Sequence, residues 1–107
     1  MPAIDQMASP SPLSSLTLLR LTVNNHPGVM LQILGLFARR GFNLEGIYCT
    51  AIGQGETSCI WLEVHASDKI EQVVKQVAKL EDVLSVEERP DAWEQVTAMA
   101  AIMNRMV

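Results

Sequence analysis

The order of two kinds of hydrophobic periodicity along the chain most constrains the fold. Residues 16–24, LTLLRLTVN, alternate apolar with other side chains, which is typical of a half-buried strand. After residue 28 the spacing becomes helical, with Met30, Ile33 and Phe37 on one side. The complete series is strand 16–24, helix 29–40, strands 43–52 and 57–65, helix 70–80 and strand 83–88.

This β-α-β-β-α-β order predicts an α+β, ferredoxin-like fold. We expect a four-stranded antiparallel sheet with both helices on one face, the first and third strands central, and the second and fourth at the edges. The other face has no helix of its own within this unit. Leu18 and Trp61 are expected on that open face, which therefore needs a cover.

At 107 residues the chain has room for one domain. We expect a flexible Pro/Ser-rich tail at 1–15, the domain itself at 16–89 and a C-terminal helical extension at 90–107. The extension has a stripe at helical spacing formed by Trp93, Val96, Ala100, Met103 and Val107. Two interpretations remain open: this helix packs on its own domain, or it docks on a partner.

Charge and composition exclude several functions. The net charge is −4, the pI is about 5.0, and Arg39-Arg40 is the only basic cluster, which argues against a nucleic-acid surface. No apolar run approaches the ~18 residues of a membrane span, and the N-terminus does not resemble a secretory signal. The two cysteines, Cys49 and Cys59, are too few for a disulfide scaffold. We expect a cytoplasmic protein.

The sequence contains no recognisable catalytic or metal-binding motif. His26 and His65 are the only histidines, and neither belongs to a cluster with metal-ligand spacing. Acylphosphatase-like enzymes share the topology, but their phosphate loop contains an arginine, which the loop NNHPG at 24–28 does not. We therefore predict no catalytic residues, no metal site and no cofactor in this chain.

The NNHPG loop suits a small anionic ligand. The helix starts at Gly28 or Val29, so the N–H groups of Gly28, Val29 and Met30 lack intrahelical acceptors and can receive a carboxylate. Gly28 permits close approach, and the amide oxygens of Asn24 and Asn25 can accept from an ammonium group. Together these describe an amino-acid site. The alternative is structural: Asn25 only caps the helix or the turn, and Pro27-Gly28 shapes the connection.

The segment LRLTVNNHPGVMLQILGLFARRGFNLEGI resembles the ACT domain, whose signature places Asn-x-Pro-Gly-Val after the first strand. GLFARRGFNLEGI and KLEDVLSVEE are similar to the small regulatory subunit of acetohydroxyacid synthase (acetolactate synthase). The similarity covers about residues 16–89. Many members have a second C-terminal domain that this sequence does not contain, so the chain resembles the short type found with isozyme I.

The resemblance implies a non-catalytic partner of a large subunit that condenses pyruvate with pyruvate or 2-oxobutyrate. Thiamine diphosphate, Mg and FAD are expected on that subunit. The small subunit is expected to activate it and to confer inhibition by valine, with isoleucine and leucine as alternative effectors. A free-standing ACT amino-acid sensor that controls transcription or another enzyme is the competing function.

The resemblance also implies where the effector binds. It lies between two ACT domains, held by positions that match Asn25, Gly28 and Asn43 here. His26, Pro27, Val29 and Met30 complete the predicted effector-binding set. His26 and Met30 depart from the commonest family spelling, which leaves effector choice open.

The second strand is the predicted dimer edge. Its segment IYCTAI, from Ile47 through Tyr48 and Cys49, contains no Lys, Pro or charge, and such an edge tends to pair with another strand. Joining two copies there would form one eight-stranded sheet and bring each Asn43 close to the partner's NNHPG loop.

Overall fold

The computed structural model describes residues 16–65 and 67–107, and the predicted tail at 1–15 lies outside this part. The order of elements along the chain is that predicted from the periodicities, followed by a short 3-10 turn and a third helix. The elements are β1 (Leu16–Asn24), α1 (Val29–Arg39), β2 (Leu44–Ile52), β3 (Thr57–His65), α2 (Ile70–Ala78), β4 (Val83–Glu88), η2 (Pro90–Ala92) and α3 (Trp93–Arg105).

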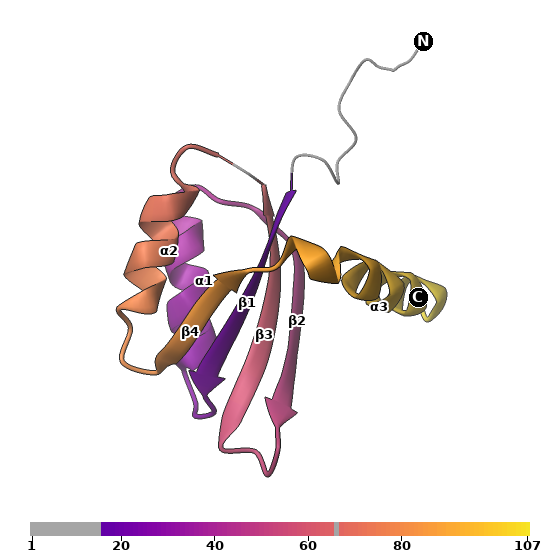
Figure 1. Ribbon diagram of the computed structural model, residues 1–107, viewed down its shortest axis with the longest axis horizontal. Coiled ribbons are helices and arrows are strands. Elements are labelled where there is room, and N and C mark those ends of the chain that lie inside the picture. The colour runs from indigo at the N-terminus through magenta and orange to yellow at the C-terminus, as the bar shows by residue number, and fades with distance from the viewer. Residues whose placement is uncertain (1–15, 66) are drawn as a thin grey trace.

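The four strands form one antiparallel sheet in the order β2-β3-β1-β4. The first and third strands are therefore central and the second and fourth are edges, as expected. Figure 1 shows α1 and α2 together on one side of the sheet and α3 on the other. The predicted ferredoxin-like α+β fold is confirmed.

The main core lies between the sheet and the helices α1 and α2. Alternate residues of β1 and β3 face the helices, and α1 and α2 contribute apolar residues at helical spacing. Ile33 and Phe37 of α1 are 0% and 1% exposed, and Val77 of α2 is 0% exposed. The strand residues of this core are Leu19, Leu21, Val23, Ile60, Leu62, Val64 and Val83.

The first half of α3 covers part of the open face. Leu18 on β1 and Val96 on α3 are each 1% exposed and form a second cluster, with Trp61 packed against it. Arg89 lies over the Trp61 ring at 5.9 Å from its centroid, a cation–π contact. The first half of the helix therefore packs on its own domain, which is the first of the two interpretations left open by the sequence. The end of α3 and the two residues that follow it carry exposed apolar side chains, namely Ile102, Met103, Met106 and Val107.

The two edges of the sheet differ in how they are protected. β4 has six residues, ends in two glutamates and has a register shift opposite Thr22/Val23. β2 has nine residues and is uncharged from Gly46 to Ile52. Short, charged and irregular edges resist further pairing, whereas long uncharged edges permit it. β2 is therefore the edge better suited to a second chain.

Candidate functional site

The NNHPG loop (residues 24–28) connects β1 to α1 in a conformation that favours glycine. Gly28 is the N-cap residue of α1 and has φ +91, in the left-handed region that L side chains rarely adopt. No side chain caps the helix, so Asn25 is not a helix cap. The Val29 N–H makes only a long 3.5 Å bond to the His26 carbonyl. In the described part of the chain, the N–H groups of Gly28 and Met30 have no acceptor.

Asn25 ties the loop to the turn between β2 and β3. Its backbone N–H donates to the Glu56 carbonyl at 3.0 Å, and its side-chain Nδ2 donates to the Gly55 carbonyl at 2.8 Å. The side chain is exposed, and its amide oxygen can still accept a bond. Asn25 thus has a structural contact and a free acceptor at the same time.

Asp82, between α2 and β4, holds the loop from the other side. Its backbone carbonyl accepts from the Asn24 N–H at 2.8 Å, and its carboxylate accepts from Asn24 Nδ2 at 3.3 Å. The second carboxylate oxygen pairs with His26 Nε2. Asp82 lies 58 residues from Asn24 in the sequence. No local pattern could have indicated this contact.

Both ring nitrogens of His26 face acceptors. Nδ1 lies 2.8 Å from the Pro27 carbonyl oxygen, and Nε2 meets the Asp82 carboxylate. Because neither acceptor can donate, both contacts are satisfied when the imidazole is doubly protonated. The Pro27 carbonyl first, and Asp82 second, raise the pKa of His26 above its ordinary value of 6.5.

Asn43 lies at the opposite end of the sheet. Asn24 and Ile52 both pair with Thr57, whereas Leu44 pairs with Val64, next to His65. β2 has nine residues, so at about 3.3 Å per residue its ends lie roughly 26 Å apart. One chain therefore does not bring Asn43 to its own NNHPG loop.

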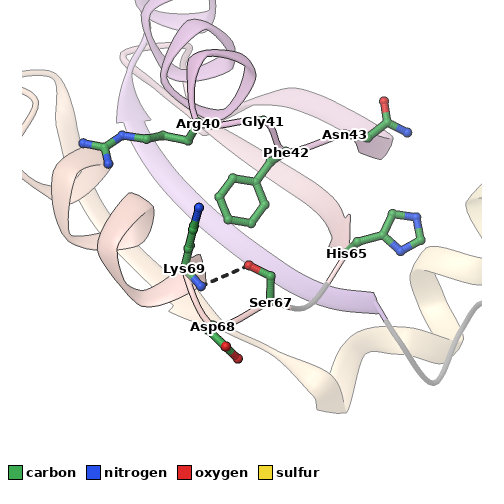
Figure 2. A pocket seen from close by; sticks show the side chains of 8 residues that line it. All are labelled: Arg40, Gly41, Phe42, Asn43, His65, Ser67, Asp68 and Lys69. Carbon is green, nitrogen blue, oxygen red and sulfur yellow. Dashed lines mark hydrogen bonds between the residues drawn. The ribbon is translucent and has the colours of Figure 1, made fainter.

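Asn43 is exposed and lines one side of a pocket of about 490 Å³. Figure 2 shows Phe42 in the middle, with Asn43 and His65 toward one side and Lys69 toward the other. Asn43 Nδ2 donates to Glu45, whose carboxylate lies 3.3 Å from His65 Nε2. The lining residues are Arg40, Gly41, Phe42, Asn43, His65, Ser67, Asp68 and Lys69.

The remaining predicted site residues differ in exposure. Val29 is 6% exposed and belongs to the core, so only its backbone faces the loop, while Met30 is half-buried. On the predicted dimer edge, Ile47 and Cys49 are exposed. Tyr48 instead packs in the open-face cluster.

Glu63 is a buried group that the sequence analysis missed. It is 9% exposed, and it accepts a 3.3 Å bond from the Tyr48 hydroxyl. Burial first, and the Glu63 charge second, raise the pKa of Tyr48. A Cβ at Gly46 would meet the Glu63 carboxylate at 1.8 Å, so the bare backbone of the edge strand accommodates this side chain. The Gly46/Glu63 pair lies across two strands, which only the register reveals.

Two properties of the described residues bear on alternative functions. Within residues 16–65 and 67–107, no three His, Cys, Asp or Glu side chains gather in a way that could hold a metal ion. None of the helices in the same residues has the length and apolar character needed to cross a bilayer.

Several known proteins that this chain resembles belong to one family. The model of the AHAS small subunit-like ACT domain matches residues 19–85. The small subunit of acetolactate synthase isozyme 1 from Escherichia coli K12 is 53% identical over 70 residues, covering 65% of this chain and 73% of that protein. The acetolactate synthase small subunit of Mycobacterium bovis is 36% identical over 85 residues, covering 78% of this chain and 51% of its own length.

A solved structure agrees. The acetolactate synthase small subunit from Thermotoga maritima superposes with a TM-score of 0.60 at 40% identity, over 68% of this chain and 46% of that chain. The aligned region thus spans about half or less of some longer relatives. The family model covers most of β1 and continues to the first half of β4, which includes the NNHPG loop and Asn43. The chain belongs to the ACT-domain family of acetohydroxyacid (acetolactate) synthase small subunits.

Proposed function

We propose that this small subunit regulates acetolactate synthase by binding valine between two copies of the chain. Two NNHPG loops and two Asn43 residues then form two equivalent sites. The observation that carries the proposal is the division of the site: the loop and Asn43 lie at opposite ends of the edge strand β2. An antiparallel pair of β2 strands related by a two-fold axis removes this separation.

The geometry of the pairing follows from β2 itself. With the two-fold near Tyr48, in the middle of the strand, Leu44 of one copy faces Ile52 of the other. Asn43 then lies beside the partner's turn at residues 53–56. That turn is bonded to Asn25 through Gly55 and Glu56. The contact at the turn therefore brings Asn43 to the partner's NNHPG loop.

Each part of the site has a chemical role in this proposal. The free N–H groups of Gly28 and Met30, at the positive end of the α1 dipole, receive the amino-acid carboxylate. The Asn25 amide oxygen accepts from the ammonium group, since its Nδ2 is already bonded to Gly55. Asn43 from the second copy closes the site. The half-buried Met30 contacts the branched side chain of valine, and isoleucine and leucine are the alternative effectors.

The chain acts on a separate catalytic subunit. That large subunit is expected to hold thiamine diphosphate, Mg and FAD and to make acetolactate in the cytoplasm. Association with it activates the enzyme, and valine reverses the activation. Family membership supports a regulatory rather than a catalytic role.

Reconstitution tests the proposal. The chain is purified with and without an acetolactate synthase large subunit, and acetolactate formation is measured with and without valine. We expect no activity from the chain alone, higher activity from the complex than from the large subunit, and inhibition by valine. Failure to co-purify with any large subunit, together with amino-acid binding by the chain alone, would instead favour a free-standing sensor.

A further inference from the structure

Asp82 is distant from the NNHPG loop in the sequence but makes three hydrogen bonds with it. Its backbone carbonyl accepts a hydrogen bond from the Asn24 N–H at 2.8 Å, and its carboxylate accepts one from Asn24 Nδ2 at 3.3 Å. The other carboxylate oxygen meets His26 Nε2. Its side chain is only 17% exposed, against 48% for His26. The partly desolvated carboxylate thus anchors a more exposed loop.

These contacts fix the loop at two points. Asn24 ends β1, and His26 lies two residues before the N-cap Gly28. On the far side, Asn25 is bonded to the hairpin turn. The N–H groups that face a ligand therefore keep their direction without any side-chain cap. Such preorganisation lowers the ordering cost that a ligand would otherwise have to overcome.

We infer that Asp82 is a positioning residue for the effector site, holding the NNHPG loop through Asn24 and His26 in the conformation that receives the amino acid. This inference rests on the proposed function, and it adds a residue outside the predicted set. Asp82 does not touch the ligand in this arrangement. Its effect passes through His26 and through the start of α1.

Protonation of the imidazole governs the His26 contact, because both ring nitrogens face acceptors. The carboxylates that act on His26 are Asp82 and, more weakly, Glu81, both from the α2–β4 connection, while Glu56 belongs to the hairpin on the other side of the loop. Contact with the Pro27 carbonyl and Asp82 raises the pKa of His26. The contact therefore stabilises the loop fully below the ordinary pKa of 6.5, and this contribution is lost as pH rises through the folded-state pKa.

The first test needs no ligand. The imidazole of His26 is titrated by NMR in the full chain, in Asp82→Ala and in the matched control Glu81→Ala, which changes the adjacent exposed carboxylate. His26→Gln assigns the resonance, because His65 is the only other histidine. We expect the pKa of His26 to fall in Asp82→Ala and to change much less in Glu81→Ala. An unchanged pKa in Asp82→Ala would overturn the inference.

The second test measures valine binding by calorimetry in the same variants. We expect Asp82→Ala to raise the valine Kd about tenfold, as loss of a charge-assisted hydrogen bond would do. Asp82→Asn should retain part of the affinity because it keeps an acceptor for Asn24. A valine Kd unchanged in Asp82→Ala, despite a lowered pKa of His26, would overturn the positioning role. Absence of valine binding by the wild-type chain would overturn the proposed function instead, and the titration would still decide the Asp82 contact.

Discussion

Gly28 offers the sharpest test of the effector site. Its φ of +91 lies in the left-handed region, yet a Cβ built there would meet no atom within 4 Å. A side chain is therefore strained at this position but not excluded by its neighbours. Asp and Asn tolerate the left-handed conformation better than other residues. Each should lower the free energy of unfolding by about 1–2 kcal/mol.

The two substitutions differ in charge and hardly in shape. Gly28→Asp places a carboxylate at the N-terminus of α1, where the carboxylate of valine is proposed to bind. Two unit charges about 5 Å apart at an effective dielectric near 20 repel by roughly 3 kcal/mol, which corresponds to about a hundredfold loss of affinity. Gly28→Asn carries a similar volume and a similar backbone strain without this repulsion, so its loss should be clearly smaller.

Calorimetry on the isolated chain and valine inhibition of the reconstituted enzyme measure the difference. Denaturant unfolding of both variants supplies the control for strain. We expect Gly28→Asp to bind and activate the large subunit but to transmit little valine inhibition. Equal valine sensitivity in well-folded Gly28→Asp, Gly28→Asn and wild-type chains would show that the NNHPG loop is only a turn.

Three further substitutions probe the edge, the shared site and the core. Cys49→Lys adds a charge in the middle of β2 and should weaken the dimer in sedimentation experiments, whereas Leu84→Lys, at an exposed position on the other edge, should not; equal effects would move the interface elsewhere. Asn43→Ala should weaken valine binding with little change in stability, and more cleanly than Asn25→Ala, which also releases the hairpin turn; unchanged binding would remove Asn43 from the site. Phe37→Ala should cost about 3–5 kcal/mol of unfolding free energy, because Phe37 is 1% exposed, and a loss below 1 kcal/mol would contradict that burial.

Periodicity predicted the architecture well because it reflects burial directly. Leu21 and Val23 alternate into the core, and Ile33 and Phe37 follow the helical spacing on α1, so each pattern records which side chains avoid water. The need for a cover on the open face could be predicted for the same reason, but the segment that supplies it could not, because packing of the C-terminal helix on its own domain and docking on a partner were both open. Leu18 required an apolar partner, and the first half of α3 supplies one in Val96.

Contacts between distant segments could not be predicted in this way. Three features depend on how separate segments meet in the fold: the left-handed φ of Gly28, the hydrogen bonds of Asp82 and the packing of the Glu63 side chain against Gly46. Glycine at position 28 was compatible with either sign of φ. Sequence reasoning therefore reached the residues of the loop but not the groups that hold them.

A site divided between the two ends of an edge strand couples ligand binding to association. If one copy supplies the NNHPG loop and the other Asn43, valine binds the paired state more tightly than a single chain. By linkage, valine must then strengthen the pairing by the same factor that pairing strengthens valine binding. The uncharged edge from Gly46 to Ile52 and the loop contacts of Asp82 then both affect the same coupled equilibrium of valine binding and chain pairing. Valine binding at the loop can therefore change how strongly the β2 edges pair. This regulatory effect requires no large movement of α1 or α2.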